Sequence, residues 1–470
     1  MSNRWITQFS VDTGLEVTDP ATDTVLGAAP DLDTTAALAA VAEAATAMAD
    51  WRKRSPRERS EVLRACWQAI VAETDSLAEL MALENGKTMA DARAEVSYAA
   101  EFFRWYAEEA VRLEGRLSLA PAGTNKILVS SEPIGVAVLV TPWNFPAAMA
   151  TRKIAPALAA GCGCVLKPAA ETPYTALAVA ELCRTAGVPE GLLGVVTTSD
   201  SKGVVAAMLA DRRVRALSFT GSTTVGRQLM ATAAERIVRP SLELGGNAPA
   251  IVLSDADLDV AVAGIMVAKM RNTGQACTAA NRILVHSSLH DELAERLGAE
   301  MGALVLGPGT DPATGCGPLI HHRAVDRIAA LVREAVDAGA RLVTGGAVPD
   351  RPGSYLTPTV LADVRPDARV VTEEVFGPVA PLVRFDTDDE AVALANDTEY
   401  GLSSYLFGRD LGRALGVADR VEAGMVAINR GMLSDPAAPF GGVKQSGLGR
   451  EGSHDGIAEF TETKYVAVSW

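Results

Sequence analysis

The pattern that decides the fold lies in residues 135–168, which read GVAVLVTPWNFPAAMATRKIAPALAAGCGCVLKP. The apolar run Gly135–Val140 predicts a buried strand, and the helix-length segment Pro146–Ala160 follows it. A second apolar run, Cys164–Lys167, predicts the next strand. A strand, a helix and another strand in close succession are typical of a βαβ unit, so we expect a parallel sheet.

The same alternation continues along most of the chain. After the first unit we expect further helices and strands at 173–186, 194–197, 203–210, 215–219 and 224–236. A second series begins at Pro249–Leu253 and runs to about Asn429, and the two series meet near Leu244-Gly245-Gly246. Before them we expect a hairpin at 17–28 and helical segments at 34–50, 56–84 and 89–112. The alternating end, Phe460–Val468, predicts a strand that needs a partner, for which another subunit is one source.

Composition narrows the class of protein. The chain has 470 residues, 48% of them hydrophobic, which is ample for a large core. Its 43 basic and 58 acidic residues give a net charge of −15, which argues against nucleic acid as a partner. No apolar run approaches the roughly 20 residues of a membrane span, and no targeting segment is evident, so we expect no membrane partner. Six scattered cysteines favour a reducing, cytoplasmic setting and neither a disulfide scaffold nor a metal site.

Three polar residues in breaks of the alternating pattern are candidates for chemistry. Cys277 lies in RNTGQACTAANR (271–282), Glu243 in SLELGGN (241–247) and Asn144 in TPWNFP (141–146). A thiol on a loop can act as a nucleophile, and an amide at a strand end can stabilise an oxyanion. Taken singly, an inert cysteine, a capping or solvated glutamate and a turn asparagine are the better interpretations. The five histidines have no such setting, so a general base would be a carboxylate.

A glycine-containing stretch, FTGSTTVG (219–226), follows a predicted strand and opens a predicted helix. Backbone N–H groups at a helix N-terminus suit a phosphate. The stretch lacks the lysine and hydroxyl residue of a Walker A loop and is not GxGxxG, so alone it is a weak signal.

The motifs taken together resemble the aldehyde dehydrogenase superfamily. Its members carry the same series in the same order: TPWNFP, Lys167-Pro168, FTGST, ELGG, GQAC, EEVFGPV (373–379) and PFGGVKQSGLGRE (439–451). The resemblance implies an α/β fold with a Rossmann-like cofactor domain, an α/β catalytic domain and a small β oligomerisation flap. The cofactor domain would comprise residues 1–113 and 133–244, and the catalytic domain residues 245–452. The flap would comprise residues 114–132 and 453–470. The same resemblance implies a homodimer or homotetramer.

The resemblance also implies roles for single residues. Cys277 would be the nucleophile that forms a thiohemiacetal, Asn144 would hold the oxyanion, and Glu243 would activate the water that hydrolyses the thioester. Hydride would pass to a nicotinamide cofactor. The implied cofactor-binding residues are Thr141, Pro142, Trp143, Lys167, Ala169, Ala170, Gly221, Ser222, Leu244, Glu374 and Phe376.

Residue 170 departs from the pattern of the NAD⁺-preferring members, which have a glutamate there for the adenosine ribose. Alanine removes a carboxylate that would repel a 2′-phosphate, so we expect NADP⁺ as the cofactor. NAD⁺ is the alternative, in which Glu171 or another residue compensates.

Within the superfamily the chain most resembles the succinate-semialdehyde dehydrogenases. That resemblance rests on Arg152, Arg271 and Ser434, which would bind the distal carboxylate of the aldehyde. Another ω-carboxy aldehyde, such as glutarate semialdehyde, is a close alternative. A coenzyme A-acylating enzyme, a non-catalytic scaffold and a cysteine hydrolase without cofactor fit the motifs less well. Ala279 replaces the second cysteine of a redox switch, and Arg430 would either tune the accepted chain length or face solvent.

Overall fold

The structure is a computed structural model and describes residues 3–469. The first βα series forms a six-stranded sheet in the order β19-β9-β8-β5-β6-β7, in which the β5, β6, β7, β8 and β9 pairings are parallel. Its strands are β5 (Val136–Val140), β6 (Cys164–Lys167), β7 (Leu193–Val195), β8 (Val214–Thr220), β9 (Arg239–Glu243) and β19 (Gly447–Leu448). The helices between them are α6 (Pro146–Ala160), α7 (Pro173–Thr185), α8 (Ser201–Ala210) and α9 (Thr223–Ala234).

The second series forms a seven-stranded sheet in the order β12-β13-β14-β11-β10-β16-β17. Its strands are β10 (Ala248–Val252), β11 (Ala280–His286), β12 (Arg341–Thr344), β13 (Thr359–Ala362), β14 (Val379–Phe385), β16 (Ser403–Phe407) and β17 (Met425–Ile428). Its helices are α10 (Leu258–Met270), η2 (Arg271–Gly274), α11 (His290–Gly302), α12 (His322–Asp337), α13 (Arg369–Thr372), α14 (Asp388–Asn396) and α15 (Leu411–Ala418). All pairings except β12 with β13 are parallel. A separate two-stranded sheet pairs β15 (Tyr400–Gly401) with β18 (Val443–Lys444).

The N-terminal region packs on the first sheet. It contains α1 (Arg4–Phe9), the hairpin β1 (Leu15–Thr18) and β2 (Val25–Ala29), α2 (Thr34–Trp51), α3 (Pro56–Ala72), α4 (Thr74–Glu84), α5 (Met89–Glu109) and η1 (Ala110–Arg112). The α5 helix packs against α6, and α3 packs against α5, so helices build a second layer beneath that face of the sheet. The predicted helical segment 56–84 is two helices, because the backbone leaves helical geometry at Glu73.

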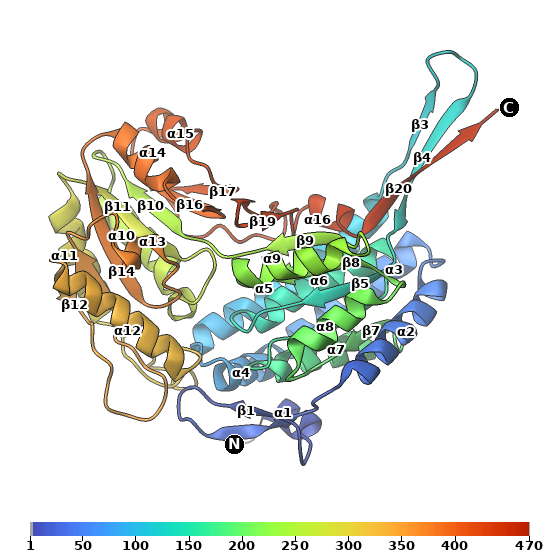
Figure 1. Cartoon of the computed structure of the whole chain (residues 1–470), viewed down its shortest axis with the longest axis horizontal. Helices are drawn as coiled ribbons and strands as arrows, with labels where there is room; N and C mark the ends of the chain where they lie inside the picture. Colours follow the sequence, from blue (N-terminus) through green and yellow to red (C-terminus); the bar gives the residue numbers. More distant parts are fainter. Residues whose placement is uncertain (1–2, 470) are drawn as a thin grey trace.

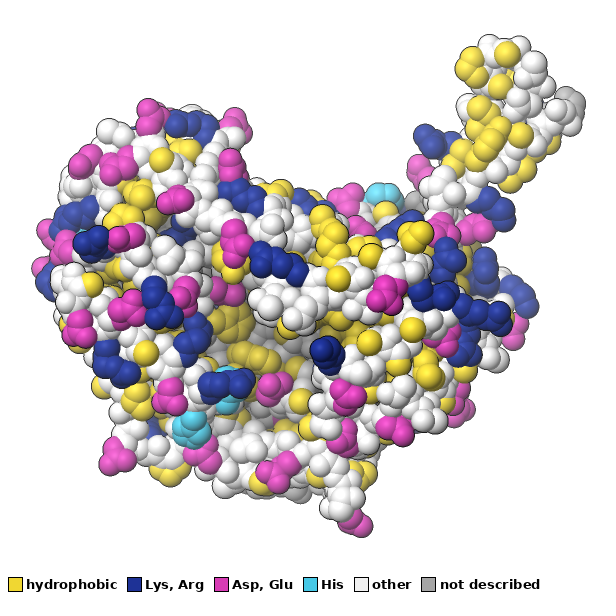
Figure 2. Space-filling view, viewed as in Figure 1, with side chains coloured by type: hydrophobic (Ala, Val, Ile, Leu, Met, Phe, Trp, Pro, Cys, Tyr) yellow, Lys and Arg dark blue, Asp and Glu magenta, His cyan; other side chains and the backbone are white. Residues whose placement is uncertain are grey.

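A three-stranded antiparallel sheet forms an arm that projects away from the two lobes (Figure 1). It consists of β3 (Arg116–Leu119), β4 (Lys126–Pro133) and β20 (Thr461–Val468), in the order β20-β4-β3. The partner of the C-terminal strand is therefore β4 of the same chain. The arm exposes apolar side chains, among them Leu117, Leu119 and Tyr465, and Figure 2 shows apolar surface along it.

The predicted domain boundaries stay predictions, and their end residues 1, 2 and 470 lie outside the described residues. Near one boundary the chain crosses between lobes: β19 lies in the predicted range 245–452 but pairs with β9 of the first sheet. The following helix, α16 (Asp455–Ala458), packs against α6. Within residues 3–469 no helix is long and apolar enough to span a membrane.

Candidate active site

A hollow of about 270 Å³ lies where the first sheet faces the second lobe (Figure 2). The loops that follow β5 and β8 contribute to its wall, and the loop before β11 contributes Cys277. Parallel sheets commonly bind ligands at the carboxyl ends of their strands, and the first sheet presents that edge here.

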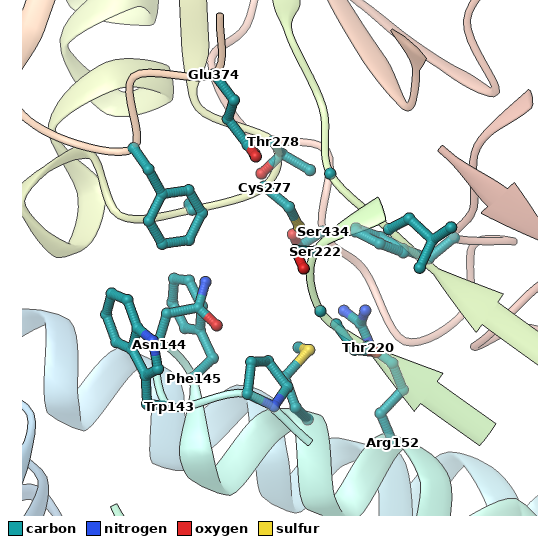
Figure 3. A pocket seen from close by; sticks show the side chains of 18 of the residues that line it. Trp143, Asn144, Phe145, Arg152, Thr220, Ser222, Cys277, Thr278, Glu374 and Ser434 are labelled. Atoms are coloured by element: carbon teal, nitrogen blue, oxygen red, sulfur yellow. The ribbon is translucent and has the colours of Figure 1, made fainter. Parts of the chain in front are cut away.

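Most of the predicted site residues meet in this hollow. Those that line it are Pro142, Trp143, Asn144, Arg152, Gly221, Ser222, Leu244, Arg271, Cys277, Glu374, Phe376 and Ser434. Thr141, Lys167, Ala169, Ala170 and Glu243 do not line it. Figure 3 shows Asn144 and Arg152 on one side of the hollow, and Cys277 and Glu374 on the opposite side.

Cys277 lies on the loop between η2 and β11, as the sequence predicts. The six cysteines all fall within the described residues, and Cys277 alone among them is not fully buried. Desolvation raises the pKa of its thiol to about 12, while Arg152 and Arg271 act in the opposite direction. The resting thiol is therefore protonated, and its use as a nucleophile requires a group that takes the proton.

Asn144 is buried at the end of the loop that connects β5 to α6. Its side-chain Nδ2 donates to the carbonyl of Gln275 at 2.9 Å, two residues before Cys277. An amide nitrogen carries two N–H donors, and that bond uses one of them. The other N–H is available to a ligand in the hollow.

Glu243 ends β9, and its carboxyl group is buried. Neither of its carboxylate oxygens has a hydrogen-bond partner among residues 3–469. Burial, and then the neighbouring charge of Glu451, raise the pKa of Glu243 well above its ordinary value. A buried carboxyl group with a raised pKa has the property that a general base at neutral pH needs.

Glu451 belongs to a buried acid–base cluster behind Glu243. Its carboxylate binds the Lys153 ammonium and accepts a hydrogen bond from Ser218 at 3.2 Å. Burial opposes its charge, but Lys153 and Arg152 together hold the pKa of Glu451 below its usual value. Glu451 is thus held ionised, whereas the environment of Glu243 favours its protonated form.

Arg152 and Arg271 have different surroundings. Arg152 is buried, lies 3.4 Å from Glu451 and donates to the Tyr98 hydroxyl at 2.5 Å. Arg271 is half-buried and has no carboxylate partner among the ion pairs of residues 3–469. Its guanidinium lies 3.4 Å from the Ser434 hydroxyl. Arg271 is therefore the cation with more capacity for an anionic ligand.

Arg430, for which the sequence left two interpretations, is exposed and does not line the hollow. It faces solvent.

The end of the hollow that holds the residues implied to bind a cofactor has features that fit a dinucleotide. Ser222 is the N-cap of α9, so backbone N–H groups of that helix face this end. A side chain at Gly221 would meet the Phe219 ring at 2.4 Å. Glu374 accepts a hydrogen bond from the Gly246 N–H at 3.2 Å, and desolvation raises its pKa to about 7. Phe376 packs edge-on against Trp143 with ring centroids 5.6 Å apart.

The loop after β6 lies beside this region, because β5 and β6 are paired as far as Val140 and Lys167. The Thr141 N–H donates to the Lys167 carbonyl at 3.2 Å, which joins the two loops. Lys167 is buried, and desolvation lowers its pKa while Glu171 opposes that change. Position 170 is a half-buried alanine, which carries no charge. These residues fit an adenine dinucleotide.

Several residues around the site were not singled out from the sequence. Lys153, Glu451 and Ser218 form the acid–base cluster, and Lys87 and Asn272 both donate to the Asn144 carbonyl. Glu451 is the last residue of the motif at 439–451, so the resemblance to the family could have drawn attention to it. Its partners lie hundreds of residues away in the chain, so no local pattern reveals them.

The comparisons with known proteins agree with this geometry. The model of the aldehyde dehydrogenase family matches residues 5–466. A succinate-semialdehyde dehydrogenase of Paenarthrobacter nicotinovorans is 54% identical over 92% of this chain and 96% of its own length. A glutarate-semialdehyde dehydrogenase of Pseudomonas putida is 48% identical over 97% of this chain and 94% of its own length.

Among solved structures, an Escherichia coli NADP-dependent enzyme superposes with a TM-score of 0.96 at 46% identity. The match covers 97% of this chain and 95% of the other. The fold and the cysteine-containing hollow define a nicotinamide-dependent oxidoreductase of aldehydes. The chain belongs to the aldehyde dehydrogenase family.

Proposed function

We propose that this enzyme oxidises succinate semialdehyde to succinate with NADP⁺ as the electron acceptor. The observation that carries the proposal is the position of Arg271 and Ser434 in the same hollow as Cys277. A guanidinium without a carboxylate partner, next to a hydroxyl, suits the distal carboxylate of a short aldehyde acid. The similarity to succinate-semialdehyde dehydrogenase supports the same substrate.

The first chemical step is addition of the Cys277 sulfur to the aldehyde carbon. The thiol proton passes to a base, which we assign to Glu243 because neither of its carboxylate oxygens has a hydrogen-bond partner among residues 3–469. Solvent takes this proton from Glu243 before the second step. The carbonyl oxygen becomes an oxyanion, which the Asn144 side-chain N–H and the Cys277 backbone N–H stabilise. A nicotinamide cofactor, which Glu374, Phe376 and Ser222 would hold, would supply the acceptor for the hydride of the thiohemiacetal carbon. The aldehyde carbon is thereby oxidised to a thioester.

The second step is hydrolysis of that thioester. Glu243 removes a proton from water as the water oxygen attacks the thioester carbon. The carbon–sulfur bond breaks, the Cys277 thiolate takes the proton back from Glu243, and the carboxylic acid is released. The raised pKa of Glu243 makes it a stronger base than an ordinary carboxylate. A coenzyme A-acylating enzyme would not need this base, so Glu243 favours hydrolysis.

The experiment that tests the activity mixes the purified protein with succinate semialdehyde and NADP⁺, without coenzyme A, and records the absorbance of reduced nicotinamide. We expect continuous turnover and one succinate for each NADPH. Glutarate semialdehyde is the second candidate because of the Pseudomonas putida relative. Comparison of kcat/KM for the two aldehydes decides between them, since one methylene changes the free energy of transition-state binding by about 1–3 kcal/mol. A folded protein that reduces neither NADP⁺ nor NAD⁺ with either aldehyde would contradict the proposal.

Replacing Arg271 with leucine is expected to raise KM for succinate semialdehyde by about 10- to 100-fold, because a hydrogen bond to a charged group contributes about 1.5–3 kcal/mol. The KM for propanal, which has no carboxylate, is expected to stay within about threefold of the wild-type value. Steady-state kinetics with both aldehydes measures the difference. Exposed Arg430→Leu is the matched control and should change neither constant. Equal changes for both aldehydes in Arg271→Leu would remove the carboxylate assignment.

The proposed preference for NADP⁺ rests on Lys167 and the small side chain of Ala170 at the end of β6. The similarity to an NADP-dependent enzyme of known structure supports it. Ala170→Glu is expected to lower the ratio of kcat/KM for NADP⁺ over NAD⁺ by about 100-fold, because juxtaposed like charges cost several kcal/mol. Ala170→Gln, of similar size without the charge, separates charge from volume. An unchanged ratio in the glutamate variant would contradict the assignment of this position.

We also propose a homodimer or homotetramer in which the arm contacts another subunit. Leu117 is 65% exposed and Leu119 is 62% exposed, so the arm leaves apolar surface in water unless a second chain covers it. A mass in solution of one 49.0 kDa chain would contradict this.

A cytoplasmic location stays a prediction, which agrees with six free thiols and is tested by cell fractionation.

A further inference from the structure

The segment Glu84-Asn85-Gly86-Lys87 connects the end of α4 to α5, where the sequence predicts only a gap between the helical segments 56–84 and 89–112. In the structure all three polar residues of this turn are buried. Gly86 has φ +86°, and a side chain there would meet Pro318 at 2.6 Å. Glycine permits this positive φ, and Pro318 and Pro20 pack closely against the turn, which restricts its movement.

Two of these polar groups hold the loop that carries Asn144. The Asn85 side-chain Nδ2 donates to the Trp143 carbonyl at 3.0 Å. The Lys87 ammonium donates to the Asn144 carbonyl at 2.8 Å. The turn thus binds the carbonyl oxygens of two consecutive residues, and the second of them bears the amide proposed to hold the oxyanion.

The Lys87 ammonium is itself held on its other side. It forms an ion pair with Glu95, and both side chains are fully buried. Glu95 also accepts the backbone N–H groups of Ala147 at 2.9 Å and Ala148 at 3.2 Å, in the first turn of α6. The pair therefore joins the carbonyl of Asn144 to the start of the helix that follows it.

A second donor converges on the same carbonyl from the cysteine loop. The Asn272 side-chain Nδ2 donates to the Asn144 carbonyl at 2.8 Å and lies 3.3 Å from the Gln275 carbonyl. Asn272 has φ +50°, which is uncommon for a residue with a side chain. The position of Asn144 relative to the loop of Cys277 is thus fixed by a buried cation on one side and an amide on the other.

We propose that Lys87 is a positioning residue of the reaction, which holds the Asn144 amide where the oxyanion develops. The inference rests on the oxyanion role proposed above for Asn144. An ion pair in the interior is an expensive way to hold a loop, since apolar side chains of similar volume often do so at no loss of stability. The ion pair is better explained by a need for precise placement of the reacting groups than by stability, because a misplacement of about 1 Å can lower a rate about 100-fold.

The test uses the full-length enzyme with Lys87→Met and Glu95→Gln combined, so that no unpaired charge stays in the interior. Glutamine retains an oxygen that accepts the two N–H groups of α6. With succinate semialdehyde and NADP⁺, we expect kcat to fall roughly 100-fold, with KM within about threefold of wild type. Thermal unfolding of the variant is followed in parallel. A change confined to KM, or a folded variant with wild-type kcat, would overturn the inference.

A double-mutant comparison separates positioning from general structure. Asn144→Ala alone is expected to lower kcat by roughly 10²- to 10³-fold. Adding the Lys87 and Glu95 changes to Asn144→Ala should then lower kcat by no more than about threefold, because the group they position is absent. Independent, multiplying losses would contradict positioning through Asn144. Wild-type kcat in Asn144→Ala would instead refute the oxyanion role itself, so the two failures are distinguishable.

Two further variants complete the design. Glu84→Gln is the matched control: Glu84 lies in the same buried turn but accepts the N–H groups of Tyr174 and Thr175 at the start of α7. Its kcat is expected to stay within about threefold of wild type. If the combined variant does not fold, Lys87→Gln with Glu95→Gln takes its place, which keeps a polar but uncharged pair and is expected to lower kcat by about tenfold through the weakened contact with the Asn144 carbonyl. Wild-type kcat in that folded variant would then overturn the proposal.

Discussion

Cys277→Ala is expected to lower turnover by roughly 10⁴-fold or more, because removal of a covalent nucleophile eliminates the pathway that depends on it. No other group of the hollow replaces it. Among the described residues the other five cysteines are buried elsewhere, and burial raises the pKa of the Cys162, Cys164 and Cys316 thiols. The measurement is NADPH formation with succinate semialdehyde at saturating cofactor.

The control for this variant is Cys66→Ala, which removes a fully buried thiol of α3. It is expected to retain wild-type kcat, because α3 packs on α5 and does not line the hollow. Cofactor binding by Cys277→Ala should also persist, since the residues proposed to hold the dinucleotide are unchanged. Turnover by a folded Cys277→Ala variant near the wild-type rate would refute the thioester mechanism.

The strands and helices around the site could be predicted from the sequence, because each is determined largely by residues that are close together in the chain. The break after Val140 and the small residues after Thr220 mark strand ends, and parallel pairing brings such ends to one edge. Comparison with the motif series then placed Asn144, Cys277 and Arg271 near one another, and they do line one hollow.

The contacts that hold these residues in place could not be predicted from the sequence, because they join chain segments that are far apart in it. Arg152 contacts Glu451 across 299 positions, since the C-terminal segment returns to pair β19 with β9. Lys87 reaches the Asn144 carbonyl across 57 positions, although its own sequence context indicates only a turn. A buried ion pair has no local periodicity, so its formation becomes evident only when the packed helices are seen.

Glu243→Gln is expected to lower steady-state kcat by about 10²- to 10⁴-fold, the range typical of a lost general base. The side chain ends β9 in a buried position, and glutamine has nearly the same shape, so the variant should fold. If Glu243 acts mainly in hydrolysis, the first turnover survives. Stopped-flow absorbance should then show a burst of about one NADPH per active site, followed by a slow steady rate.

The pH dependence gives a second, independent readout of the same residue. Only the ionised form of Glu243 can accept a proton, and burial together with Glu451 raises its pKa well above the ordinary value of about 4.3. The wild-type kcat should therefore rise with pH through that elevated pKa, later than for an ordinary carboxylate, and this limb should vanish in Glu243→Gln. Glu459→Gln, a half-buried carboxyl with a raised pKa outside the hollow, should keep the wild-type profile.

Interception of the thioester decides which step Glu243 serves. Hydroxylamine attacks a thioester without a general base, so it should restore turnover in Glu243→Gln and yield the hydroxamate in place of succinate. Rescue together with a full burst assigns Glu243 to water activation. A variant with neither burst nor rescue would show that the carboxylate is needed earlier, to take the proton of the Cys277 thiol, whose pKa of about 12 makes that transfer necessary.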